Sequence, residues 1–257
     1  MAVYITGDIH GELGIGRLSS QNWTLGKTLT RNDYLVILGD FGLIWDLVES
    51  KREKYWLDWL ENKPWTTLFI DGNHENFARL NSEFEVKEWH GGKIHEIRPH
   101  IYHLMRGEIF NLDGYKCLAF GGAASVDRAD RIEDISWWAA EMPSDVECAH
   151  CVENLIANGD KVDVVFTHEA PAVAFWGAMA GVSYGPDKLA YWLQGNIAEA
   201  VEFKRWYFGH HHIDRTWTKP YTPVFEDIVK MELDKDEPRS IDGQATADYE
   251  RVWGGLA

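Results

Sequence analysis

Five short apolar segments of this chain each run into a group of Asp, His or Asn residues. The groups are Gly7-Asp8-Ile9-His10-Gly11, Gly39-Asp40-Phe41-Gly42, Gly72-Asn73-His74-Glu75, His168 and Gly209-His210-His211-His212. The apolar segments have the length and composition of buried strands. In open α/β sheets, ligands bind beyond the carboxyl ends of the strands. The five groups are therefore expected to meet in one place, although they lie far apart in the sequence.

The apolar pattern predicts a layered α/β domain, because predicted strands alternate with predicted helices. Strands are expected at Val3–Thr6, Tyr34–Leu38, Thr67–Asp71, Lys116–Phe120, Val162–Thr167 and Arg205–Phe208. Helices are expected over Ser50–Asn62, Ala149–Asn158 and Asp187–Leu193. In the first helix, Tyr55, Trp56, Trp59 and Leu60 are spaced to share one face. A late run, Pro223–Leu233, has strand character and is expected to complete a second sheet.

The chain is expected to form one domain over residues 1–233. Residues 121–145 begin with Gly121-Gly122 after a predicted strand and continue with polar and aromatic residues, which is typical of an insertion that overhangs a cleft. Residues 234–257 are polar and include Pro238 and several glycines, so we expect a tail that packs weakly.

The polar groups contain the residue types that bind two neighbouring divalent cations. The candidate ligands are Asp8, His10, Asp40, Asn73, His168, His210 and His212. We expect one ion at Asp8, His10 and His212, and the other at Asn73, His168 and His210. Asp40 is expected to bridge the two ions, because two dications about 3.5–4 Å apart repel strongly and need a shared carboxylate.

These five blocks, in this order, give the chain its resemblance to the calcineurin-like metallophosphoesterase superfamily. The resemblance covers most of the chain and implies a four-layer αββα sandwich. It also implies a dinuclear site at the carboxyl ends of the strands, holding Mn, Fe, Zn or similar ions. His74 is implied as a catalytic residue that binds neither ion and lies on the leaving-group side.

One block departs from the pattern of the Ser/Thr protein phosphatases in this superfamily. Those enzymes continue the second block into Asp-Arg-Gly, whereas this chain reads Asp40-Phe41-Gly42. The arginine expected to grip phosphate is absent from that place. The chain is more similar to bacterial and phage-type members, and the resemblance names no substrate for it.

The resemblance implies metal-dependent hydrolysis of a phosphate ester by water that the two ions activate. Asp40 and His74 are the expected catalytic residues. Two alternatives remain open: a metal-dependent nuclease of the same fold, and a protein-binding scaffold without activity. The net charge of −16 disfavours non-specific binding of nucleic acid and binding at anionic membrane surfaces. The scaffold is disfavoured because all the ligand positions and His74 are filled.

Arginines near the predicted insertion are candidates for binding phosphate oxygens, which match a guanidinium fork. These are Arg106, Arg128 and Arg131, and ordinary surface arginines paired with neighbouring carboxylates are the alternative. Three cysteines and no leader-like apolar stretch predict a cytoplasmic protein. Cys148 and Cys151 have redox or metal spacing, but a structural or incidental role is favoured because no second pair accompanies them.

The remaining histidines and one glutamate are expected to stay outside the ion-binding shell. His211 should point away from its two neighbours if that segment is extended. Glu75 is expected to orient its loop rather than bind metal. A surface or structural role is expected for His90, His95, His100 and His103.

Overall fold

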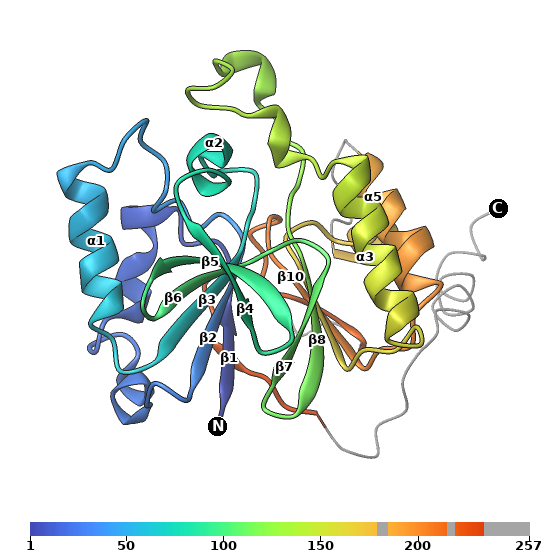
Figure 1. The fold of residues 1–257 in the computed structure, drawn as a ribbon, viewed down its shortest axis with the longest axis horizontal. Coiled ribbons are helices and arrows are strands. Elements are labelled where there is room, and N and C mark those ends of the chain that lie inside the picture. Colours follow the sequence, from blue (N-terminus) through green and yellow to red (C-terminus); the bar gives the residue numbers. More distant parts are fainter. Residues whose placement is uncertain (179–184, 215–218, 234–257) are drawn as a thin grey trace.

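Two β-sheets pack face to face between outer layers of helices (Figure 1), as a computed structural model of residues 1–178, 185–214 and 219–233 shows. The strands are β1 (Val3–Thr6), β2 (Tyr34–Leu38), β3 (Thr66–Ile70), β4 (Glu85–Trp89), β5 (Gly92–Arg98), β6 (Ile101–Leu104), β7 (Glu108–Leu112), β8 (Tyr115–Phe120), β9 (Val164–Thr167), β10 (Arg205–Phe208), β11 (Tyr221–Pro223) and β12 (Val229–Lys230). The helices are α1 (Lys51–Glu61), α2 (Phe77–Leu80), α3 (Asp145–Ala157), α4 (Ala172–Ala178) and α5 (Lys188–Leu193). The predicted αββα sandwich is confirmed.

Both sheets are mixed, with parallel strands at the centre and antiparallel strands at an edge. The first sheet has the order β12-β1-β2-β3-β6-β5-β4, and the second has the order β11-β10-β9-β8-β7. In the first sheet, β1, β2, β3 and β6 are parallel. In the second, β8, β9, β10 and β11 are parallel. The carboxyl ends of these central strands therefore lie at one end of the sandwich.

Alternating side chains of the central strands fill three apolar layers. On β2, Val36 and Leu38 face the other sheet, while Leu35 and Ile37 face the helical side, and all four are buried. The second sheet uses the same alternation, with Phe166 in the middle layer and Val165 beneath the helices of its own side. Strands covered on both faces read as continuous apolar runs, which is why these strands were predictable.

Helix α1 begins at a Ser cap and covers the first sheet with a face that differs from the predicted one. Ser50 Oγ accepts from the backbone N–H of Glu53 at 3.1 Å, which caps the helix. The fully buried side chains are Glu53, Leu57 and Leu60. Tyr55 is 60% exposed, and its ring lies 5.1 Å from that of Trp56. Trp56 and Trp59 lie at the edge of that face.

The late apolar run does not form one strand of one sheet. Tyr221–Pro223 pairs with β10 in the second sheet, whereas Val229–Lys230 pairs antiparallel with β1 in the first. Between them, the Asp214 carboxylate accepts from the backbone N–H groups of residues 225–227 and holds a turn. Because this turn redirects the chain, only Pro223 of the predicted run Pro223–Leu233 belongs to the second sheet.

Residues 121–145 connect β8 to α3 and stand above the strand ends (Figure 1). They contain short 3-10 turns at Arg128–Asp130 and Ala139–Glu141. The domain boundary at residue 233 remains a prediction, and the predicted tail over 234–257 lies outside the described residues. Within the described part of the chain, no helix is both long and apolar enough to cross a membrane.

Candidate metal centre

The predicted ligands come from the carboxyl ends of parallel strands in both sheets. Asp8 lies two residues beyond β1 and Asp40 two residues beyond β2. Asn73 follows β3, His168 follows β9 directly, and His210 lies two residues beyond β10. Because the two sheets pack face to face with their central strands ending on the same side, these strand ends lie close together.

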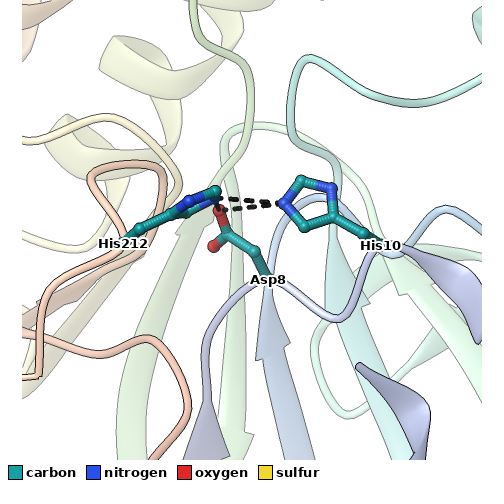
Figure 2. Close-up of side chains that lie close together, drawn as sticks. All are labelled: Asp8, His10 and His212. Atoms are coloured by element: carbon teal, nitrogen blue, oxygen red, sulfur yellow. Dashed lines mark hydrogen bonds and ion pairs between the residues drawn. The ribbon is translucent and has the colours of Figure 1, made fainter. Parts of the chain in front are cut away.

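Three side chains converge on one point from opposite ends of the sequence (Figure 2). The Nε2 atoms of His10 and His212 lie 3.1 Å apart. Oδ2 of Asp8 lies 3.1 Å from Nε2 of His212 and 3.9 Å from Nε2 of His10. That oxygen is buried and accepts no well-directed hydrogen bond. These three residues form one group of donor atoms that can hold an ion.

Asp8 also belongs to a second group, with Asp40 and His168. His168 is fully buried, and its Nδ1–H donates to the carbonyl oxygen of Leu38 at 2.6 Å. That bond fixes the tautomer, so the lone pair of Nε2 points into the site. Nε2 lies 3.4 Å from Oδ1 of Asp40 and 3.2 Å from Oδ1 of Asn73.

The Asp40 carboxylate, a member of the second group, also approaches His10 of the first. Its Oδ1 accepts from the backbone N–H groups of Asn73 at 2.9 Å and His74 at 2.8 Å. Its Oδ2 lies 3.7 Å from Nδ1 of His10 and 3.9 Å from Nε2 of His74. The two backbone bonds hold the carboxylate in one orientation.

The calcineurin-like phosphoesterase family model matches residues 1–214. The chain belongs to this family. No curated protein sequence matches it.

The donor atoms of this family member fit divalent transition-metal ions. Two imidazole nitrogens face each other beside a buried carboxylate oxygen that lacks a directed donor, and a bound cation would satisfy all three. Although burial alone would raise the pKa of Asp8, the surrounding histidines, His168 first, lower it well below its ordinary value. Asp8 is therefore ionised at neutral pH, as a ligand must be.

The glycines that precede the ligands are required by close packing. A Cβ on Gly39 would lie 2.2 Å from Nδ1 of His168, and a Cβ on Gly72 would lie 2.1 Å from Oδ1 of Asp40. Four candidate ligands also have positive φ angles: His10, Asp40, His210 and His212. Left-handed backbone at residues other than glycine is uncommon and clusters at functional sites.

Asn73 is oriented by the segment above the strand ends. Its Nδ2 donates to Oγ of Ser125 at 3.1 Å, and that hydroxyl donates to Oε2 of Glu141 at 2.5 Å. Glu141 also accepts from the backbone N–H of Ser125 at 3.0 Å. All three residues are buried. The amide oxygen of Asn73 is thereby turned toward His168 and the site.

Glu169 holds the histidine-rich segment and was not predicted from the sequence. Its Oε1 lies 2.8 Å from Nε2 of His211, and its Oε2 lies 3.7 Å from Nε2 of His210. The His211 ring lies against Phe175 and Phe208 rather than the ion-binding groups. The His210 ring lies 4.9 Å from that of His168, and burial lowers the pKa of His210 to about 4. His210 is therefore neutral and available as a ligand beside the second group.

Glu75 supports the loop after β2. Its carboxylate accepts from the backbone N–H groups of Phe41 at 2.7 Å and Gly42 at 3.2 Å, and the side chain is fully buried. Burial, followed by the neighbouring Asp40, raises the pKa of Glu75 well above its ordinary value. This placement agrees with a role in orienting the loop, and neither donor group includes Glu75.

The three candidate arginines occupy different environments. Arg106 is buried, and its guanidinium binds Asp71, Glu147 and the carbonyl oxygens of residues 140 and 141. These contacts argue against a role for Arg106 in phosphate binding. Arg128 is exposed and lies 4.0 Å above the ring of Trp137. Arg131 pairs with Asp127 at 2.6 Å and lines a pocket next to His10 and His74.

Proposed function

We propose that this phosphoesterase hydrolyses a phosphate ester at two divalent transition-metal ions, such as Mn, Fe or Zn. Asp8, His10 and His212 would hold one ion, and Asn73, His168 and His210 would hold the other, with Asp40 between them. The observation that carries the proposal is the pair of Asp/His groups that share Asp8, whose buried Oδ2 lacks a directed donor. Bound there, the ions supply Lewis-acid activation of water and of the phosphate oxygens.

The charge of the protein ligands leaves the loaded site attractive to phosphate. Asp8 and Asp40 are the carboxylates of the two groups, and they offset two of the four positive charges that two ions would bring. The site would therefore be positive within a chain whose net charge is −16. Both carboxylates are buried, which limits screening by solvent.

His74 is placed to deliver a proton to the leaving oxygen. Its backbone N–H binds Asp40, while its ring is 23% exposed and lines the adjoining pocket. Its Nε2 lies 3.9 Å from Oδ2 of Asp40, so the ring stands beside the ion-binding groups. A proton donated by His74 would neutralise the alkoxide as it departs. No residue of the chain has to form a covalent phosphoenzyme.

Arg131 supplies further positive charge at the edge of the site. Its Nε and Nη2 bind Asp127, and its Nη1 donates to the carbonyl oxygen of Ser136 at 3.0 Å. The side chain is thus held beside the pocket that contains His74. We assign it an electrostatic contact with the phosphate, whereas Arg128 stacked on Trp137 is the weaker candidate.

Neither alternative function gains support from the site. The pocket beside the centre includes Glu12, Asp46 and Glu53 in its lining, which is no basic path for a nucleic acid strand. A scaffold without activity would not need a buried carboxylate oxygen that lacks a donor, since such an atom destabilises the fold.

The test combines metal content with turnover. Protein purified without chelator and reloaded should approach two ions per chain by elemental analysis. With Mn²⁺ it should then hydrolyse at least one member of a panel of p-nitrophenyl phosphate, its bis ester, nucleotides and a single-stranded DNA. EDTA should remove the activity, and Mn²⁺ should restore it. Metal content that stays near zero after reloading would refute the proposal.

A further inference from the structure

A pocket of about 310 Å³ adjoins the first group of donor atoms. Its lining includes His10 and His74, and helix α1 contributes Arg52 and Trp56. Its volume is at the lower end of the range found for sites that bind small molecules. Since His74 is the proposed proton donor to the leaving oxygen, the group attached to that oxygen would extend into this pocket.

Aromatic and aliphatic side chains form much of the pocket wall. Trp45 is half-buried, and its ring centroid lies 6.0 Å from that of His74 and 5.4 Å from that of Trp138. Trp56 of α1 also lines the pocket. Leu13, which is 86% exposed, completes the apolar lining. Tryptophan rings beside a polar centre offer a stacking surface for a flat ring system.

The charges in the pocket neutralise one another. Arg52 pairs with Glu12 at 2.9 Å, Arg131 pairs with Asp127, and Glu53 pairs with Arg79 at 2.8 Å. Asp46 adds one further carboxylate. The pocket therefore has no excess positive charge to compensate a second phosphate, and a charged leaving group would be repelled.

We propose that this pocket binds the leaving group of the substrate, and that this group is an uncharged planar ring system of nucleoside size, stacked against Trp45 and Trp56. The substrate class is then a nucleoside monophosphate, with its phosphate at the metal centre and its base in the pocket. The assignment rests on the proposed phosphoesterase function. It names which ester that function acts on.

Binding of adenosine to the metal-free protein tests the pocket without any turnover. Calorimetry should detect adenosine binding and no binding of glycerol. Trp45→Ala should raise the dissociation constant for adenosine about 5- to 150-fold, the range seen when an aromatic partner of a stacked base is removed. Trp56→Ala gives a second, independent variant. Trp192→Ala is the matched control, because Trp192 is also half-buried but stacks on Phe120 in the helical layer of the other sheet.

Kinetics with Mn²⁺ then separate this inference from the proposed function. Adenosine 5′-monophosphate and glycerol 3-phosphate both release a primary alcohol, so the chemical step is matched. The nucleotide should be preferred at least tenfold in kcat/KM, and Trp45→Ala should remove that preference mainly through KM. Equal turnover of both esters would overturn the inference and leave the proposed function standing. Adenosine binding without turnover of any ester would defeat the proposed function and leave the pocket assignment intact.

Discussion

Asn73 donates a hydrogen bond of 3.1 Å to Ser125, a residue of the segment that stands above the strand ends. Ser125 is in turn held by the buried Glu141. A side-chain amide can be oriented with either its oxygen or its nitrogen toward the site, but it binds a metal ion only through the oxygen. The Ser125 contact selects the orientation in which the oxygen faces His168.

Ser125→Ala should therefore weaken retention of one of the two ions by about 10- to 100-fold, the usual effect of removing a group that orients a ligand. Chelator titration followed by elemental analysis would measure it. Ser82→Ala, which removes an exposed hydroxyl bound to Ala78, is the control and should retain both ions. Equal retention by both variants would show that Asn73 needs no support.

Replacing Asp40 and His74 should separate metal binding from chemistry. Asp40→Ala should remove activity and weaken metal retention together, because two neighbouring dications lose their shared carboxylate. His74→Ala should keep both ions and lower kcat by about 10²–10⁴-fold, the usual contribution of a positioned proton donor. The loss should be larger for alkyl phosphates than for p-nitrophenyl esters, whose leaving oxygen needs little protonation. If His74→Ala loses metal as Asp40→Ala does, the role given to His74 is wrong.

Arg131 and Arg106 should respond to substitution in opposite ways. Arg131→Ala should raise KM several-fold and change the free energy of unfolding by less than about 0.5 kcal/mol, because its ion pair is at the surface. Arg106→Ala should destabilise the fold by about 3–5 kcal/mol, because Asp71 is left charged and buried. Steady-state kinetics and urea unfolding measure the two effects. A raised KM in an Arg106→Ala protein of unchanged stability would show instead that Arg106 binds the phosphate.

His95 should make stability fall in mildly acidic solution. It is buried, its Nδ1 lies 3.0 Å from Nδ1 of His103, and Nε2 of His103 lies 3.1 Å from Asp71. Burial, then the neighbouring His103, lowers the pKa of His95 from 6.5 to about 4, so the unfolded chain binds more protons between these values. The contribution of His95 to the free energy of unfolding is therefore complete above pH 6.5. As the pH falls toward 4, roughly 1–3 kcal/mol of that free energy is lost.

His95→Asn keeps a side-chain amide near the position of Nδ1 and removes the titration. Urea unfolding at several pH values should therefore give this variant a flatter stability profile between pH 6.5 and 4 than the unaltered chain. His90→Asn is the control, because the side chain of His90 is exposed. A profile for His95→Asn that matches the unaltered chain would assign the acid sensitivity to other groups.

The sequence was sufficient to predict the sandwich and the family, because both depend on local patterns. Apolar runs mark the central strands, and the polar groups that follow them carry the family motif. Strands β4 to β7 were missed. In β4 and β5, Glu, Lys and Arg interrupt the apolar residues, as in Glu85–Trp89, whereas β6 is only four residues long. Single-sequence patterns do not reveal edge strands of this kind, whose apolar face is half-covered.

The supporting residues were less predictable than the candidate ligands. Glu169, Ser125 and Glu141 belong to no motif, and each acts through a contact made only in the folded chain. The same holds for Arg106, whose partner Asp71 was counted only as the end of a strand. Asp71 lies 35 residues away in the chain, and no local spacing links the two.

The pairing of Asp8 with the His210-His212 segment also sets the order in which the site can be made during synthesis. The hydrogen bond from the backbone N–H of His210 to the Asp8 carboxylate joins residues 202 positions apart. At translation rates of about 5–20 residues per second, Asp8 would emerge roughly 10–40 s before its partners. Until His210 and His212 have been synthesised, the nascent chain carries only part of the first donor group, so tight ion binding has to wait for that segment.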